Sequence, residues 1–106
     1  MALPRPPGHL SPESRRWWKT IVELFELEAH HLRVLTAAAE AFDRKEEARR
    51  LIAAEGLVVR DRFGTLKPHP AAAIERDSRL AFGRLVRELD LDVGPPREMP
   101  RVAGRR

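Results

Sequence analysis

The basic side chains of this sequence offer the clearest chemistry, which is the binding of phosphate groups. The chain of 106 residues has 20 Lys and Arg against 16 Asp and Glu, a net charge of +4 at neutral pH. Basic residues that neutralise phosphates release condensed counterions, which favours a polyanionic partner such as DNA. The candidate DNA contacts form three groups along the chain: Arg15, Arg16 and Lys19; Arg60, Arg62 and Lys67; and Arg101, Arg105 and Arg106.

Each of these basic groups also has a purely structural interpretation. Phosphate contacts require only accessible positive charge, and a basic helix face is also a common solubility device. The middle group falls on a short extended segment, where a β-ribbon can contact DNA or an adjacent subunit, or form a small structural flap. The last group is either an electrostatic tether or a means of keeping the chain end soluble.

Catalytic and cofactor chemistry finds little support in the sequence. The chain has no cysteine, so it has no disulfide, thiolate nucleophile or cysteine-based zinc site. The sequence lacks a phosphate-binding G-x-x-x-x-G-K-[ST] loop, a G-x-G-x-x-G fingerprint and a G-x-S-x-G elbow. The histidines have no metal-ligand spacing such as H-E-x-x-H; they are His9, His30, His31 and His69. We therefore expect a non-catalytic protein without a metal or cofactor.

Composition divides the chain into a central domain and two different ends. Residues 1–10 are proline-rich and predict a flexible arm with too few apolar residues to pack. Residues 92–106 contain three prolines, two glycines and four arginines, a composition that predicts a flexible basic tail. Residues 11–91 then form one helical domain. No apolar run approaches the roughly 20 residues that are needed to span a bilayer. The N-terminal residues also lack the apolar core of a signal peptide, so we do not expect secretion.

Two helices are predicted in the first half of the domain. Ser11, Pro12 and Glu13 provide an N-cap, a first-turn proline and a carboxylate at the positive helix end. This short helix is expected to break near Glu28. A long second helix follows from about His30 to a glycine C-cap at residue 56. The apolar stripes are Trp17, Ile21, Leu24 and Phe25 in the first helix, and Leu32, Leu35, Ala39, Phe42, Leu51 and Ile52 in the second.

A small β-hairpin is predicted between the second helix and a third one. Residues 57–60 are largely apolar and β-branched, residues 61–64 supply turn chemistry, and residues 65–67 pair back. The third helix, of medium length, starts at Pro70 and ends near Asp90, with Ile74, Ala81, Leu85 and Leu89 on one face. The fold class is therefore mainly α, with three helices and one hairpin.

Several large apolar residues are candidates for contacts between subunits. A domain of this size buries a modest core, which makes help from neighbouring subunits plausible. Trp17 and Trp18 are consecutive and cannot both occupy the centre of one helical stripe, so one can anchor the core and the other a subunit contact. The candidate interface residues are Trp17, Trp18, Leu35 and Phe42.

An ordered series of short motifs resembles the small subunits of phage terminases. The motifs are LSPE at residues 10–13, RWW at 16–18, AAEGLVV at 53–59, KPHPA at 67–71 and IERD at 74–77, followed by Phe82, RL at 84–85 and REL at 87–89. The resemblance covers about residues 10–91. The combination in this order is far more specific than any single motif.

The resemblance implies a mainly helical protomer that forms a homo-oligomeric ring. It further implies that the ring binds double-stranded viral DNA and presents it to the ATPase and nuclease of the terminase large subunit, in the cytoplasm of the infected bacterial host. Two alternatives remain open from the residues alone. One is a dimeric DNA-binding transcriptional regulator, and the other is a structural helical adaptor that does not bind DNA.

Overall fold

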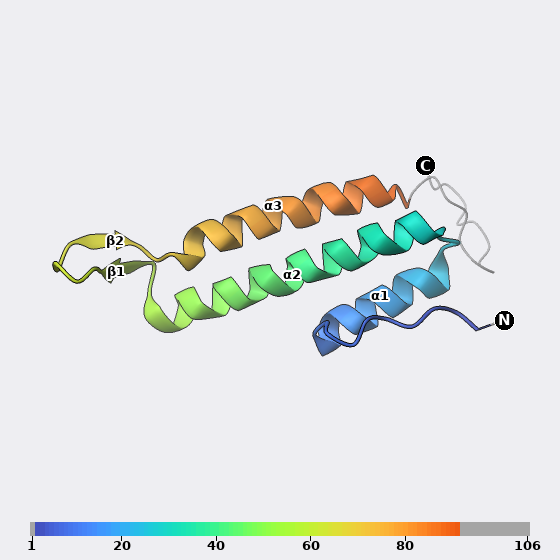
Figure 1. Ribbon diagram of the computed structural model, residues 1–106, viewed down its shortest axis with the longest axis horizontal. Helices are drawn as coiled ribbons and strands as arrows, with labels where there is room; N and C mark the ends of the chain where they lie inside the picture. The colour runs from blue at the N-terminus through green and yellow to red at the C-terminus, as the bar shows by residue number, and fades with distance from the viewer. Residues whose placement is uncertain (1, 92–106) are drawn as a thin grey trace, which may run out of the picture.

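The computed structural model describes residues 2–91 and confirms a mainly helical fold with one small hairpin. The elements in order are α1 (Pro12–Leu24), α2 (Ala29–Glu55), β1 (Val58–Arg60), β2 (Leu66–Pro68) and α3 (Ala71–Leu89). Figure 1 shows an elongated arrangement in which α3 runs back along α2 and the hairpin projects from the turn between them. The shorter α1 lies along one half of α2, away from the hairpin.

The start of α1 agrees with the prediction from the sequence. Ser11 is the N-cap, and its Oγ accepts a hydrogen bond of 3.1 Å from the backbone N–H of Ser14. Pro12 occupies the first turn, where its missing N–H removes no helical hydrogen bond. The cap residue therefore satisfies one of the donors that every helix N-terminus leaves open.

The end of α1 differs from the prediction, which set the break near Glu28. The helix ends at Leu24, and Phe25 adopts an extended conformation with φ −129° and ψ 148°. In an extended segment alternate side chains point the same way, and both Phe25 and Leu27 pack against the core. Glu26 and Glu28 are exposed instead. Burial of two apolar side chains therefore overrides continuation of the helix.

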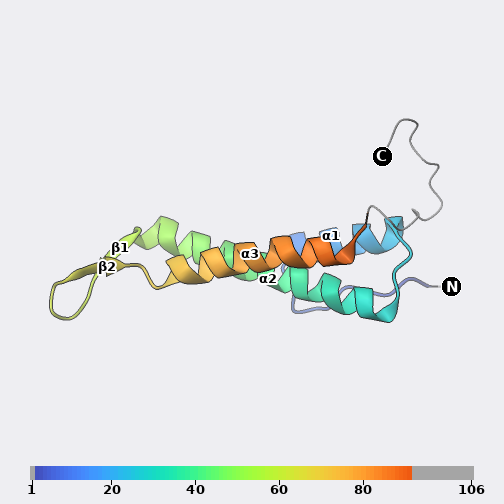
Figure 2. The same ribbon diagram turned by 90° about the horizontal axis from the view of Figure 1, so that it is seen from above.

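The two long helices pack against each other through small buried residues. Ala38 and Ala48 of α2 and Ala71 and Ser78 of α3 are all buried. Small side chains let two helix backbones approach closely, and α2 and α3 are the most extensively packed pair of elements. Figure 2 shows α3 crossing over α2 at a shallow angle along most of its length.

The hydrophobic core is concentrated where all three helices meet. Leu35 is fully buried, and the indole of Trp18 is 3% exposed while its Nε1 donates a 3.1 Å hydrogen bond to Thr36 Oγ1. The predicted flexible arm also contributes, because Leu10 is 2% exposed. That apolar residue at the end of the arm was not expected to pack. The buried cluster comprises Leu10, Trp18, Ile21, Val22, Leu35, Ala39 and Leu89.

Two residues predicted on packed stripes are half exposed instead. Leu51 of α2 is 48% exposed and Ile74 of α3 is 47% exposed. Adjacent helical positions point about 100° apart, so Leu51 and Ile52 cannot both face α3, and Ile52 is the one that is half-buried. Figure 1 shows that α1 lies along the other half of α2, which is consistent with the exposure of Leu51 and Ile74.

The hairpin confirms the predicted strand–turn–strand segment. The strands are antiparallel, with Val58 opposite Pro68, Val59 opposite Lys67 and Arg60 opposite Leu66. Asp61 organises the turn: its Oδ1 accepts hydrogen bonds from the backbone N–H groups of Phe63 (2.8 Å) and Thr65 (3.0 Å). Gly64 has a φ of +81°, a conformation that glycine adopts without steric penalty.

Candidate nucleic-acid and assembly surfaces

The hairpin holds three of the predicted DNA contacts at the far end of the molecule. Arg60, Arg62 and Lys67 are all exposed. The strand register places Arg60 and Lys67 on opposite faces of the ribbon, because they occupy neighbouring pairs in the ladder. Arg60 donates a 2.7 Å hydrogen bond to the carbonyl of Gly64, and the guanidinium of Arg62 lies 5.0 Å from the ring centre of Phe63. The hairpin is thus a cationic ribbon with charge on both faces.

His69 fixes this ribbon to the two long helices. Its Nδ1 accepts a 2.9 Å hydrogen bond from the backbone N–H of Ala71, which leaves Nε2 as the donor toward Glu55 Oε1 at 2.6 Å. The backbone N–H of His69 donates to the carbonyl of Leu57 at 2.8 Å. One buried side chain therefore links the end of α2, the hairpin and the start of α3. In the sequence, His69 has no assigned function beyond its place in the KPHPA motif, and the sequence pattern does not reveal this role.

The predicted DNA contacts on α1 lie apart from the hairpin. Arg15 is half-buried and donates hydrogen bonds to the carbonyls of Gly8 (3.1 Å) and Leu10 (2.7 Å), so it holds the N-terminal segment against α1. Arg16 and Lys19 are exposed, and neither forms an ion pair within residues 2–91. The two basic groups occupy different halves of the molecule in Figure 1. The third group, Arg101, Arg105 and Arg106, lies outside the described residues.

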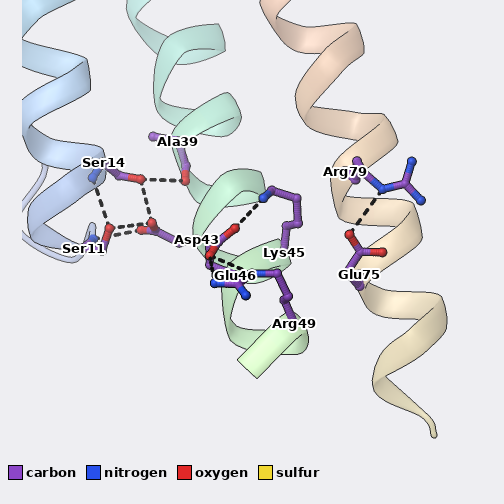
Figure 3. Close-up of polar contacts among 9 residues, drawn as sticks. All are labelled: Ser11, Ser14, Ala39, Asp43, Lys45, Glu46, Arg49, Glu75 and Arg79. Atoms are coloured by element: carbon purple, nitrogen blue, oxygen red, sulfur yellow. Dashed lines mark hydrogen bonds and ion pairs between the residues drawn. The ribbon is translucent and has the colours of Figure 1, made fainter. Parts of the chain in front are cut away.

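A carboxylate on α2 ties down the start of α1. Asp43 accepts hydrogen bonds from the Ser11 backbone N–H (2.8 Å), the Ser11 hydroxyl (2.6 Å) and the Ser14 hydroxyl (2.6 Å) (Figure 3). Burial alone would raise the pKa of Asp43, but the hydrogen bonds from Ser11 and Ser14 outweigh it and lower the pKa. Asp43 is therefore a charged clamp between the first two helices.

Ion pairs occupy much of the charged surface of α2 and α3. Glu46 pairs with Lys45 and, three residues on, with Arg49 at 2.8 Å, and their hydrogen bonds lower the pKa of Glu46 to about 2. On α3, Arg79 pairs with Glu75 at 3.2 Å (Figure 3). Glu46 and Arg49 lie three residues apart, a spacing that places two side chains next to each other on a helix surface.

The four predicted interface residues fall into two classes. Trp18 and Leu35 are buried inside the protomer, so their side chains are taken up by its own core. Trp17 and Phe42 are half-buried and both contact Phe82 of α3, with ring centres 5.8 and 5.5 Å apart. Together with Glu13 and Ser14 they line a pocket of about 240 Å³. Trp17 and Phe42 are thus the two whose side chains retain accessible surface.

A larger groove, not anticipated from the sequence, lies at the hairpin end of α2 and α3. Its volume is about 540 Å³. The apolar lining consists of Ala48 and Leu51 from α2 and Ala71 and Ile74 from α3, and the charged lining consists of Arg44, Glu47 and Arg50. The groove matches the stretch where α1 does not cover α2. The sequence pattern places Leu51 and Ile74 on packed apolar stripes, so it does not predict that they line an open groove.

Metal-binding clusters and membrane-spanning helices are both absent from the described residues. Within residues 2–91, no group of three or more His, Asp or Glu side chains is arranged to hold a metal ion. None of the helices in that part of the chain combines the length and apolar character needed to cross a membrane. The surfaces left to consider are the cationic hairpin, the basic face of α1 and the apolar groove.

The described residues therefore form an elongated helical fold with a projecting cationic ribbon and an uncovered apolar groove. The chain belongs to the phage terminase small-subunit family: the family model described as "Phage terminase, small subunit" matches residues 13–95. This confirms the resemblance seen in the sequence. No significant match is found among curated proteins or among solved structures. Members of this family are generally non-catalytic subunits that act in phage DNA packaging.

Proposed function

We propose that the protein assembles into a homo-oligomeric ring that binds viral DNA and delivers it to the terminase large subunit in the cytoplasm of the infected host. The family match over residues 13–95 is the observation that carries this proposal. In this scheme the large subunit supplies the ATPase and nuclease activities, and the small subunit positions DNA and regulates them. The cationic hairpin and the exposed basic residues of α1 support a polyanionic partner.

A ring makes modest phosphate contacts effective. Each protomer offers Arg60, Arg62 and Lys67 on the hairpin and Arg16 and Lys19 on α1, and a ring repeats these charges around a duplex. Linked weak contacts add through effective concentration, so no single arginine needs to read a base. The tail residues Arg101, Arg105 and Arg106 add further charge in the sequence. Selectivity for a packaging site then rests on the shape of the DNA.

The DNA-binding proposal is tested by the salt dependence of affinity for a duplex, measured by fluorescence anisotropy. The logarithm of the binding constant falls linearly with the logarithm of the salt concentration. Removal of one phosphate-binding charge reduces the magnitude of this slope by about 1 for each copy of the chain that contacts the DNA. We expect Lys67→Gln to weaken binding and lower the slope. Lys45→Gln is the matched control, because Lys45 is paired with Glu46 and is largely buried. Binding that is absent or independent of salt would favour a structural adaptor without DNA.

The assembly proposal is tested by light scattering of the full chain without DNA, at low and high salt. A salt-resistant mass several times the protomer mass of 12.1 kDa supports the ring. A simple dimer at all concentrations would favour the transcriptional regulator. Delivery to the motor is tested separately, by adding the protein to the large subunit and DNA and measuring ATP hydrolysis.

A further inference from the structure

Most of the exposed large apolar side chains of this protein gather at its hairpin end. Their exposed fractions run from 47% for Ile74 to 78% for Phe63. Large exposed apolar patches of this kind are typical of interaction sites. We call this set the distal apolar surface; it consists of Leu51, Leu57, Val58, Phe63, Leu66 and Ile74.

The distal apolar surface has a projecting part and a hollow part. Val58 and Leu66 lie on the same face of the hairpin, because their cross-strand partners Pro68 and Arg60 place them in alternate pairs of the ladder. They are 53% and 59% exposed. Leu51 and Ile74 line the 540 Å³ groove between α2 and α3. Both parts lie at the same end of the long helices (Figure 1).

The hairpin itself has little support within the protomer. A two-stranded hairpin is marginally stable in water unless it packs against further strands or a helix. Here β1 and β2 pair only with each other, and every residue of β2 is exposed. Figure 2 shows the ribbon extending past the ends of both long helices. Beyond its anchor at His69, the hairpin therefore presents strands that another molecule can cover.

We propose that the hairpin of one copy, through Val58 and Leu66, enters the Leu51–Ile74 groove of the next copy. The proposal rests on the ring assembly proposed above and adds the surface that builds it.

A groove contact fits better than a contact between two hairpins. Pairing hairpin with hairpin would place two sets of Arg60, Arg62 and Lys67 together, and like charges at short range repel. Arg60 lies on the same hairpin face as Val58 and Leu66, and the groove rim offers it one opposite charge, Glu47, beside Arg44 and Arg50. Aliphatic stems of arginine can cover apolar surface while their charges stay in water.

The proposed contact joins two different surfaces of the chain. A contact of this kind generates a ring if the rotation closes and a filament if each copy is displaced along the axis.

The experiment measures mass by light scattering for the full-length protein and three variants. We expect Leu66→Glu on the hairpin and Leu51→Glu in the groove each to reduce the mass several-fold, to that of the protomer. Leu80→Glu is the matched control, because Leu80 is equally exposed at 58% but lies outside the distal apolar surface. All three sites are exposed, so folding should persist, and circular dichroism verifies it.

Mixing the two defective variants distinguishes the hairpin–groove contact from other modes. One variant retains its groove and the other its hairpin, so an equimolar mixture should form a 1:1 dimer of twice the protomer mass. No recovery on mixing would overturn the hairpin–groove pairing, as would a ring that survives both substitutions or is abolished in Leu80→Glu. If the wild-type protein is still multimeric in those cases, the proposed ring assembly remains supported and only the hairpin–groove contact is wrong. A monomeric wild-type protein would overturn the ring and this contact together.

Discussion

The two halves of the α2–α3 helix pair differ in how they bury their apolar side chains. In the three-helix half, where α1 covers α2, apolar side chains from four segments of chain meet in a closed core that includes Trp18, Leu35 and Leu89. In the hairpin half, α2 and α3 pack on each other through Ala48, Ala71 and Ser78. Larger apolar side chains there remain on the surface. The same two helices thus enclose a buried core at one end and leave apolar side chains exposed at the other.

The difference follows from the length of α1. That helix reaches along α2 only as far as Asp43, where its N-cap is clamped, and α2 continues to Glu55. Beyond Asp43 the same amphipathic pattern has no third helix to cover it. A short first helix is therefore enough to convert a core stripe into an exposed groove.

Truncation of matched leucines in α2 should show the largest difference between the halves. Leu35→Ala removes a fully buried side chain and is expected to reduce the free energy of unfolding by about 4 kcal/mol. Leu51→Ala removes a side chain that is 48% exposed and should cost less than about 1 kcal/mol. Urea unfolding followed by circular dichroism measures both. The Leu66→Glu background keeps both variants as protomers for this comparison, and equal losses would contradict the two-half description.

Removal of the clamp carboxylate should weaken the three-helix half alone. Asp43→Ala eliminates three hydrogen bonds to Ser11 and Ser14, and we expect a loss of about 3 kcal/mol because charged acceptors make the stronger bonds. Both variants are compared in the Leu66→Glu background, where Glu47→Ala, one turn further along α2 and outside the clamp, should change the free energy of unfolding by less than about 0.5 kcal/mol. Urea unfolding measures both free energies. A reduction of similar size in both variants would show that Asp43 acts only as surface charge.

The order and type of the elements could be predicted from the sequence because their signals are local. The Ser11–Pro12 cap, the glycine after α2 and the turn residues around Asp61 act through their own backbone neighbours. The end of α1 was missed although a signal exists. Residues 25–28 alternate apolar and acidic, which is typical of an extended segment with one buried face.

The candidate surfaces were harder to predict because they depend on contacts between distant segments. The groove arises because α1 stops short of Leu51, which helical periodicity within α2 cannot reveal. The roles of Asp43 and His69 likewise require partners many residues away or across a turn. Trp18 was separated from Trp17 only by three-dimensional packing. Charge composition indicated the cationic hairpin correctly, because exposure of basic residues in a short turn needs no tertiary information.

Loss of the histidine joint should affect the hairpin half with a smaller energy. His69→Ala removes the bonds to Glu55 and to the Ala71 N–H, and about 1–2 kcal/mol is expected. The local consequence is faster hydrogen exchange of hairpin amides, with the helices of the three-helix half still protected. His30→Ala, an exposed position near the other end of α2, should leave exchange in the hairpin unchanged. Uniform loss of protection across the chain would contradict a local joint.

Acidification should destabilise the three-helix half before the rest of the fold. We expect this to be the smallest of the predicted changes in the free energy of unfolding. The pKa of Asp43 lies below its ordinary value of 3.8 in the folded chain, so its stabilising effect is complete above that pH and disappears as the pH falls through the folded pKa. The pKa of Glu46 is also lowered, to about 2, so its stabilising effect likewise declines as the pH falls from 4.5 toward 2.

The two tryptophans make this transition observable, because Trp17 and Trp18 both lie in α1 and are the only ones in the chain. On acidification below about pH 4, tryptophan fluorescence should change before the helical circular dichroism signal. Asp43→Asn, which cannot be titrated, should have a smaller stability at neutral pH and a flatter acid response, whereas Glu46→Gln should flatten the response only at the lowest pH. If wild type and Asp43→Asn lose fluorescence in parallel, the carboxylate of Asp43 does not hold α1 in place.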